Sequence, residues 1–379
     1  MLDENNVLIA DESGVVKDIV HQKDAGGDIE IFEGLLSPGF INCHCHLELS
    51  HMKNVVENGT GLVEFLIKVV GKRSAVKEEI EAAMQAADEE MYNNGIVAVG
   101  DICNTTDSIS IKQKSKIQYH NFIEVLGFTE EKAKARLTPY LYVYKEFCEA
   151  GFAEHTSIVP HAPYTISKTM FQLINEASAG KIISIHNQEC LAEDELYRTA
   201  TGDFFKLYYH LDINTDFFLP YKTSSIQSYL PLLNNAKKLI LVHNTFTKQP
   251  DLDFAFDQAA KSNQQIYWCL CANANLYIEN KLPPVELFKQ NYCDIVLGTD
   301  SYSSNWSLNI LDEIKTLQKN FPLLQLKEML KWATLNGAKA LGINYISGSF
   351  ENGKQPGIVI IDNLVNKKIS NISEVKRLV

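Results

Sequence analysis

Residues 38–46 (PGFINCHCH) combine a turn, a short apolar run and two histidines. Pro-Gly interrupts the backbone, so a strand is predicted to begin at Phe40. Successive side chains on a strand point to opposite faces, so His44 and His46 project together while the cysteines beside them point away. Two imidazoles on one face form half of a metal site. Taken alone, the pair is equally consistent with two structural histidines.

The overall composition narrows the class of protein. The chain has 379 residues, 45% of them hydrophobic and 22% charged, as in ordinary globular proteins. This length suits a large α/β barrel with or without a small accessory domain. The formal net charge is −12 and the sequence has no Lys/Arg-rich run, so neither nucleic acid nor a membrane surface is expected as a partner.

Targeting signals and cysteine usage point to a cytoplasmic protein. No segment approaches the ~20 consecutive apolar residues of a membrane span, and residues 1–6 lack the basic region of a signal peptide. Eight cysteines in this length are too sparse for a disulfide scaffold. Cys269 and Cys271 share a predicted strand face, and we expect buried thiols there rather than a second metal site.

Both ends of the chain are predicted to form short β-strands. Residues 1–37 alternate apolar pieces with turn residues, and the last piece runs from Ile29 to Leu36. Residues 357–362 repeat this pattern and are followed by a polar tail. We expect residues 1–37 and 345–379 to form one small β-sandwich domain beside a hydrolase barrel of residues 38–344.

Between the ends, apolar runs alternate with helical patterns such as 74–93 and 130–150. The eight runs begin at Phe40, Ile96, Ile117, Ile158, Ile182, Leu239, Ile266 and Ile295. Near-continuous apolar runs are typical of parallel strands buried on both faces. Eight strands, each followed by a helix, predict an α/β fold of the (β/α)₈ TIM-barrel type. An open doubly wound sheet is the alternative, and it explains less well why polar residues end nearly every run.

The C-terminal strand ends of such a barrel open onto one face, where active sites lie. The residues that end the predicted strands are His44, His46, His161, His186, His243 and Asp300, which include five of the ten histidines. Three imidazoles and one carboxylate suit Zn²⁺, and also Fe²⁺ or Mn²⁺. Such an ion lowers the pKa of a bound water to about 7, which supplies hydroxide at neutral pH.

Together these motifs resemble the amidohydrolase superfamily. The similar segments are 38–46, 186–189 (HNQE), 242–244 (VHN), 298–301 (GTDS), 336–342 and 353–354. Within the superfamily they are similar to the mononuclear-metal cytosine, guanine, S-adenosylhomocysteine and aminofutalosine deaminases and to chlorohydrolases. The resemblance implies one divalent metal per chain, Zn²⁺ first and Fe²⁺ as the alternative. The implied metal ligands are His44, His46, His186 and Asp300.

The resemblance also implies catalytic roles for Glu189, His243 and Asp300. His243 would polarise the metal-bound water, and Glu189 would carry protons, because ring attack and ammonia departure both need a proton donor. The alternative for Glu189 is a solvated carboxylate beside the acidic stretch 193–195. The resemblance implies that two-metal members of the superfamily carry a bridging lysine at the end of the fourth strand. The fourth predicted strand here does not end in a lysine, which favours a site with one metal.

Substrate contacts are expected in the loops after the strands. Segment 161–164 (HAPY) is similar to one that approaches the substrate in nucleoside deaminases, although a structural turn at Pro163 is the alternative. Ala272 replaces the proline of the similar family segment. Glu48 is a candidate hydrogen-bond acceptor for an amino heterocycle or a ribose, and it is equally consistent with an ordinary salt-bridge partner. The candidate substrate-binding residues are Glu48, His161, Tyr164, Asn275 and Asn305.

The resulting hypothesis is hydrolytic deamination of an amino-substituted purine or purine nucleoside, aminofutalosine or an adenosine-like compound, by a metal-bound hydroxide. The alternatives are hydrolysis of a C–Cl or amide bond on a related heterocycle, and an inactive scaffold barrel. The latter is disfavoured because the whole predicted residue set is present. The partner is a small-molecule substrate, and the resemblance suggests a homodimer. The aromatic stretch Tyr197–Tyr229 is predicted to be a lid, an interface or a helix packed on the barrel.

Overall fold

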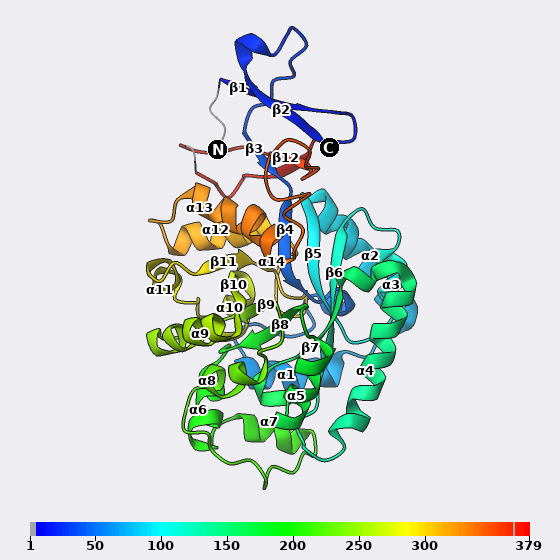
Figure 1. The fold of residues 1–379 in the computed structure, drawn as a ribbon, viewed down its shortest axis with the longest axis vertical. Helices are drawn as coiled ribbons and strands as arrows, with labels where there is room; N and C mark the ends of the chain where they lie inside the picture. Colours follow the sequence, from blue (N-terminus) through cyan, green and yellow to red (C-terminus); the bar gives the residue numbers. More distant parts are fainter. Residues whose placement is uncertain (1–4, 367) are drawn as a thin grey trace.

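Eight parallel strands form the centre of the computed structural model, which describes residues 5–366 and 368–379 (Figure 1). In chain order they are β4 (Phe40–Cys45), β5 (Ile96–Cys103), β6 (Gln118–Val125), β7 (Thr156–Pro160), β8 (Ile182–Asn187), β9 (Lys238–His243), β10 (Gln265–Leu270) and β11 (Asp294–Leu297). Strands β4 to β7 pair in sequence order, as do β8 to β11. Each predicted apolar run is therefore confirmed as a strand.

Two seams join these groups into a closed ring. Between β11 and β4, the backbone amides of Thr299 and Asp300 each donate to the carbonyl oxygen of His44 at 3.0 Å. Between β7 and β8, the amide of His186 donates to the carbonyl oxygen of His161 at 2.9 Å. The (β/α)₈ barrel is confirmed, and the open doubly wound sheet is excluded.

The barrel helices surround this ring (Figure 1). They are α1 (Leu62–Lys72), α2 (Lys77–Asn93), α3 (Ile109–Lys112), α4 (Ala133–Phe147), α5 (Lys168–Ala177), α6 (Leu191–Thr199), α7 (Phe204–His210), α8 (Ser225–Tyr229), α9 (Gln249–Ser262), α10 (Ala272–Glu279), α11 (Val285–Gln290), α12 (Ile310–Asn320), α13 (Leu326–Lys331) and α14 (Gly337–Ala340). The predicted helices at 74–93 and 130–150 correspond to α2 and α4. Helix α4 begins only after Lys132, whose φ of 61° is left-handed and cannot continue a helix.

The main apolar core lies inside the ring and between the ring and the helices. Every residue of β9 is buried, as expected for a strand covered on both faces. On the next strand, Trp268 stacks on Phe288 of α11 with a ring-centroid distance of 5.2 Å. Burial of one such large side chain stabilises the fold by about 1.5–3 kcal/mol. Cys269 and Cys271 are buried free thiols, as predicted.

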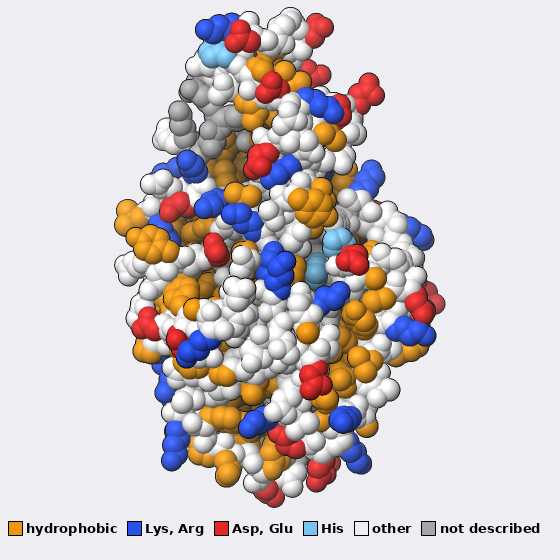
Figure 2. All heavy atoms as spheres, in the orientation of Figure 1, with side chains coloured by type: hydrophobic (Ala, Val, Ile, Leu, Met, Phe, Trp, Pro, Cys, Tyr) orange, Lys and Arg blue, Asp and Glu red, His pale blue; other side chains and the backbone are white. Residues whose placement is uncertain are grey.

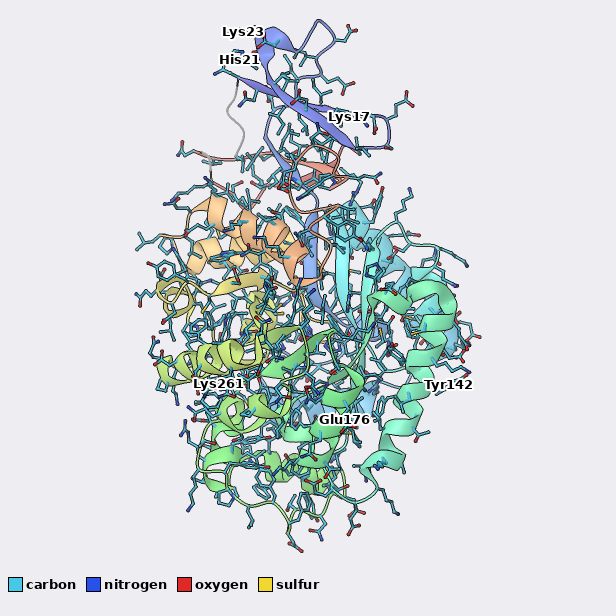
Figure 3. All side chains as sticks on the ribbon, in the orientation of Figure 1. Lys17, His21, Lys23, Tyr142, Glu176 and Lys261 are labelled. Atoms are coloured by element: carbon cyan, nitrogen blue, oxygen red, sulfur yellow. The ribbon has the colours of Figure 1, made fainter. Side chains whose placement is uncertain are left out.

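Short antiparallel sheets bring the two ends of the chain together beside the barrel (Figure 1). Strand β1 (Asn6–Ala10) pairs with β2 (Val16–His21), and β3 (Leu35–Pro38) pairs with β12 (Ile358–Ile361), which also pairs with β13 (Val375–Arg377). Figure 3 shows Lys17, His21 and Lys23 on the β1–β2 end of the molecule, away from the barrel. The predicted association of the two ends is confirmed, whereas the domain boundaries at 38 and 344 stay a prediction.

Two details of the terminal segments differ from the sequence analysis. The strand expected from Ile29 to Leu36 is wrong over most of its length, because a strand starts only at Leu35, where β12 offers a partner. The side chains of Ile31 and Phe32 are 83% and 44% exposed. The polar tail, in contrast, contains β13, because backbone pairing with β12 does not require apolar side chains.

The molecular surface mixes charges of both signs. Figure 2 shows acidic and basic side chains interspersed over one face, with apolar side chains between them. None of the helices in the described part of the chain is both long and apolar enough to cross a membrane.

Candidate metal centre

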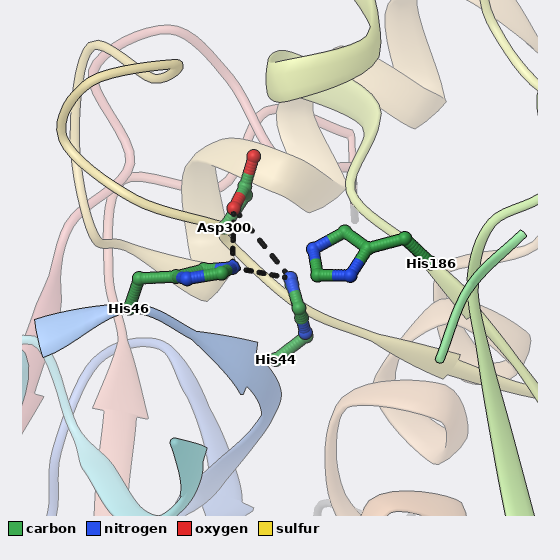
Figure 4. Close-up of side chains that lie close together, drawn as sticks. All are labelled: His44, His46, His186 and Asp300. Atoms are coloured by element: carbon green, nitrogen blue, oxygen red, sulfur yellow. Dashed lines mark hydrogen bonds and ion pairs between the residues drawn. The ribbon is translucent and has the colours of Figure 1, made fainter. Parts of the chain in front are cut away.

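His44 and His46 project from the C-terminal end of β4 onto the same side, as the alternation of a strand predicts (Figure 4). Their Nε2 atoms lie 3.1 Å apart. Asp300 follows β11, and its Oδ1 lies 3.5 Å from Nε2 of His44 and 3.3 Å from Nε2 of His46. The seam of the barrel thus brings three ligand-type atoms together from opposite ends of the sequence.

His186, at the end of β8, completes the group. One ligand atom from each of His44, His46, His186 and Asp300 lies within 4.8 Å of the others. Nδ1 of His186 lies 2.8 Å from the carbonyl oxygen of His161, so this nitrogen donates to the backbone and Nε2 is left for a metal. Asp300 has a left-handed φ of 58°, and the hydroxyl of Ser304 donates to its Oδ2 at 2.6 Å. The hydrogen bond to His161 fixes the orientation of the His186 ring, and the hydrogen bond from Ser304 fixes that of the Asp300 carboxylate.

The spacing and chemistry of these residues fit one small divalent cation. A tetrahedral ion with bonds of about 2.0–2.1 Å has neighbouring ligand atoms about 3.3 Å apart, close to the separations of 3.1, 3.3 and 3.5 Å seen here. Burial lowers the pKa of His46 to about 4 and that of His186 well below its usual value, which favours the neutral, ligating imidazole. Buried lone pairs that face one another call for a cation between them.

His243 ends β9 beside the metal centre in a left-handed conformation (φ 71°). Its Nδ1 lies 2.9 Å from Oδ1 of Asn275, and the Asn275 amide donates to Thr245 Oγ1 at 2.7 Å. This arrangement makes Nδ1 the protonated nitrogen of neutral His243. Nε2, which has no hydrogen-bond partner among the described residues, faces Glu189 Oε1 at 3.5 Å. Burial lowers the pKa of His243 to about 4, despite the opposing charge of Asp300.

Glu189 is held close to the metal centre by a second carboxylate. Glu193, near the start of α6, accepts the backbone amides of Gln188 at 3.0 Å and Glu189 at 3.3 Å, and also the hydroxyl of Ser225. Burial, with repulsion from Asp300, raises the pKa of Glu189 well above its usual value. The alternative of a solvated Glu189 is not supported, because both Glu189 and Glu193 are buried. Glu193 is the third residue of α6, so its carboxylate reaches back to the two amides just before the N-cap residue Cys190.

The predicted substrate-binding residues all lie around the C-terminal face, and most are braced by protein contacts. Glu48 accepts the backbone amides of Asn104 and Thr105 at 3.1 Å, and burial raises its pKa to about 7. Tyr164 is buried and stacks on Phe204 at 4.2 Å. Oδ1 of Asn275 accepts the hydrogen bond from Nδ1 of His243. The direct substrate contacts of these residues stay a prediction.

Asn305 and His161 differ in their hydrogen-bond partners and in their burial. The amide of Asn305 donates to the carbonyl oxygen of Thr299 at 2.6 Å and to Glu313 Oε1 at 2.9 Å, so it supports the loop that carries Asp300. His161 is half-buried, and its Nδ1 lies 2.9 Å from Thr165 Oγ1. Of the two residues, Asn305 is buried and His161 remains partly exposed.

A buried ion pair that was not predicted from the sequence lies next to the end of β4. Asp101 Oδ2 lies 2.6 Å from Lys112 Nζ, and both side chains are 0% exposed. Asp101 Oδ1 accepts the backbone amide of Leu47 at 2.8 Å. The pair therefore anchors the residue that follows His46. In the sequence, Asp101 is recognisable as the polar residue that follows an apolar run. No sequence pattern indicates that Lys112 lies beside it in the fold.

A second apolar cluster, separate from the main core, covers the mouth of the barrel. It includes Phe65 of α1, Phe128 and Tyr208 of α7, and Phe128 stacks on Tyr208 at 4.4 Å. Within the stretch Tyr197–Tyr229, Phe204 and Tyr208 are buried in this cluster, whereas Phe217 is 44% exposed. Part of the stretch therefore packs over the site, and the interface alternative stays open for its exposed part.

These features define a (β/α)₈ barrel with a buried metal site of three histidines and one aspartate at its C-terminal face. The sequence model of the Amidohydrolase family matches residues 35–378, and the chain belongs to this family.

Curated and solved relatives extend over nearly the whole chain. An adenosine deaminase of Helicobacter pylori is 28% identical over 371 residues, covering 95% of this chain and 86% of that protein. The crystal structure of Helicobacter pylori aminofutalosine deaminase with methylthio-coformycin has a TM-score of 0.82 and 24% identity, covering 99% and 95% of the two chains. An adenosine deaminase from Xanthomonas campestris with bound zinc has a TM-score of 0.71 and 20% identity, covering 95% and 80%.

Proposed function

We propose that this protein is a metal-dependent deaminase that hydrolyses the amino group of an adenine-type nucleoside. The observation that carries the proposal is the placement of Glu189 and His243 beside the four ligand residues. Deaminases of adenosine and aminofutalosine among the similar proteins support the choice of substrate class.

One divalent cation per chain, zinc first and iron as the alternative, would be held by His44, His46, His186 and Asp300. A similar protein with bound zinc supports this assignment. When bound, the ion supplies a water of lowered pKa as the nucleophile. The residues of the chain then bind, orient and move protons around that water and the substrate.

Glu189 is the proton carrier in this proposal. Its raised pKa keeps the carboxyl protonated, so it donates to the ring nitrogen next to the attacked carbon. Having given that proton to the ring, Glu189 takes another from the attacking oxygen and delivers it to the departing amine. His243 accepts a hydrogen bond from the attacking water through Nε2, because Nδ1 is committed to Asn275. In this proposal Asp300 takes up the water's other proton, which restores protonated Glu189 at the end of the cycle.

The aromatic cluster over the barrel mouth supports catalysis by excluding bulk water. Glu48, His161, Tyr164, Asn275 and Asn305 are the proposed substrate-side residues. The partner is a small molecule. The proposed homodimer is tested by light scattering of the purified protein.

Ammonia release tests the proposed function directly. Purified protein loaded with Zn²⁺ is given adenosine, 5′-deoxyadenosine, aminofutalosine, guanine and a chlorinated triazine. We expect ammonia from at least one adenine nucleoside, with the matching ultraviolet change of the purine ring. Chloride release without ammonia would establish the C–Cl alternative, and silence across the panel by protein containing one zinc per chain would contradict both.

A further inference from the structure

We propose that Glu124 is a specificity-determining residue that accepts a hydrogen bond from a sugar hydroxyl of the substrate. This inference rests on the proposed nucleoside deaminase activity and extends it. Glu124 would thereby favour nucleosides that carry a ribose diol over nucleosides that lack the diol.

Glu124 carries an unused acceptor in a buried position. It lies near the C-terminal end of β6, and its residue surface is only 3% exposed. Asn104 Nδ2 donates to its Oε2 at 2.9 Å. Its Oε1 is buried and has no hydrogen-bond partner among the described residues. A buried carboxylate oxygen without a donor is costly, so such an atom calls for a specific explanation.

The free oxygen of Glu124 lies beside His186, one of the four ligand residues. Oε1 lies 3.8 Å from Nδ1 of His186, too far for a hydrogen bond. That nitrogen already donates to the carbonyl oxygen of His161. Nδ1 of His186 is therefore unavailable to a second cation, although ligand-type atoms of Glu124, His161 and His186 lie within 4.8 Å of one another. The remaining role for Oε1 is to accept from a molecule bound in the site.

His161 supplies a second acceptor beside Glu124. The hydroxyl of Thr165 donates to the carbonyl oxygen of Ala162 at 3.0 Å, so its oxygen accepts from His161 Nδ1 at 2.9 Å. In the neutral imidazole, Nε2 of His161 then carries a lone pair. Glu124 and His161 together form a small group of acceptors next to the reaction centre.

Two neighbouring acceptors select a ligand with neighbouring donors. The ring nitrogens N1, N3 and N7 of an adenine nucleoside are acceptors, and its amino group is at the reacting carbon. Its remaining donors are the sugar hydroxyls, of which the 2′ and 3′ hydroxyls are adjacent. A hydrogen bond from a hydroxyl to an ionised carboxylate is also among the stronger kinds. The ligand chemistry that fits is a vicinal diol.

The test compares two substrates, adenosine and 2′,3′-dideoxyadenosine, in wild type and Glu124→Ala. We expect the ratio of their kcat/KM values to fall by roughly tenfold or more in the variant, because only adenosine loses a bond to a charged partner. Equilibrium binding of inosine and 2′,3′-dideoxyinosine, followed by calorimetry, should show the same selective loss. Zinc content should equal that of the wild type.

Two further variants keep the test decisive. If Glu124→Ala does not fold, Glu124→Gln replaces it: Asn104 holds the side-chain oxygen of the glutamine, so its amide group faces the site and the charged acceptor is lost. Glu149→Gln is the control, because Glu149 is an exposed carboxylate that pairs with Lys145 and has no part in the proposed site. It should leave the kcat/KM values of both substrates unchanged.

The outcomes separate this inference from the proposed function. A substrate ratio that Glu124→Ala and Glu124→Gln leave unchanged overturns the role of Glu124, even if the wild type is an active deaminase. Wild-type protein with full zinc that releases no ammonia from either nucleoside overturns the proposed function instead.

Discussion

Oδ1 of Asn275 lies 2.9 Å from Nδ1 of His243 and thereby decides which nitrogen of the imidazole faces the metal centre. The Asn275 amide nitrogen donates to Thr245 Oγ1, so the carboxamide cannot turn over without losing that bond. The lone pair of His243 Nε2 is consequently fixed toward Glu189. This relationship connects a residue outside the metal group to the handling of the attacking water.

Asn275→Ala should lower kcat by about tenfold to a hundredfold, because His243 loses the partner that fixes its tautomer. Zinc content should not change, since His243 is not among the four ligand residues. Asn275→Asp keeps an acceptor at the same place and should recover most of the activity. Steady-state kinetics and metal analysis of the three proteins check this, and equal activity in all of them would contradict it.

Glu189→Gln should lower kcat by at least about a hundredfold, because the amide can neither give up nor regain a proton. The metal should remain, since the ligand residues are untouched. The matched control is Glu195→Gln on α6, an exposed carboxylate of the same acidic stretch. Unchanged turnover in Glu189→Gln would falsify the proton-carrier role.

Removal of the metal should destabilise the protein and reveal the stoichiometry. Chelation leaves the lone pairs of His44 and His46 facing one another at 3.1 Å, and ligand binding to the native state alone stabilises by mass action. We expect a lower melting temperature after chelation and recovery with Zn²⁺. Asp300→Asn should weaken metal retention. Elemental analysis that finds two tightly bound ions per chain would contradict the single-metal assignment.

Lys112→Met should reduce the free energy of unfolding by about 3–5 kcal/mol, because it leaves the Asp101 carboxylate buried without its cation. The double variant Lys112→Met/Asp101→Asn should be less destabilised than the single one, since no uncompensated charge remains. Urea unfolding measures both. Lys145→Met, which removes the exposed i,i+4 ion pair between Lys145 and Glu149, is the control and should cost less than about 1 kcal/mol. Equal effects of Lys112→Met and Lys145→Met would contradict the prediction.

Glu313 should make stability depend on pH. Burial raises its pKa to about 8, although Asn273 and Asn305 donate to it. The native state therefore binds a proton that the unfolded state releases near its usual pKa of 4.5. The wild type should lose stability relative to Glu313→Gln as pH rises from about 4.5 to about 8, at up to ~1.4 kcal/mol per pH unit. Urea unfolding at several pH values tests this, and parallel curves for the two proteins would contradict it.

The sequence predicted the metal group because parallel strands determine it. Once His44, His186 and Asp300 are placed at strand ends, barrel closure brings them to one face whatever the loops do. The His44/His46 pair follows from the two-residue period of a strand. These inferences depend only on local pattern and ring closure.

The residues that escaped prediction depend on tertiary contacts. Lys112 lies on the four-residue helix α3, too short for any periodicity, and only the folded chain brings it to Asp101. Glu124 lies inside a strand that was otherwise predicted as apolar. A carboxylate in such a strand indicates a special role, because carboxylates are rarely buried without a partner. Ile29 to Phe32 resembled a strand in composition but lack a neighbouring strand to pair with in the described structure.

Three of the four ligand residues come from the two strands that meet last along the chain. His44 and His46 belong to β4 and Asp300 follows β11, so an ion held between them would cross-link the beginning and the end of the barrel. A nascent polypeptide shorter than 300 residues lacks the carboxylate and has no partner for the free edge of β4. Zinc retention by nested C-terminal truncations would therefore report when, during synthesis or refolding, the ring becomes complete.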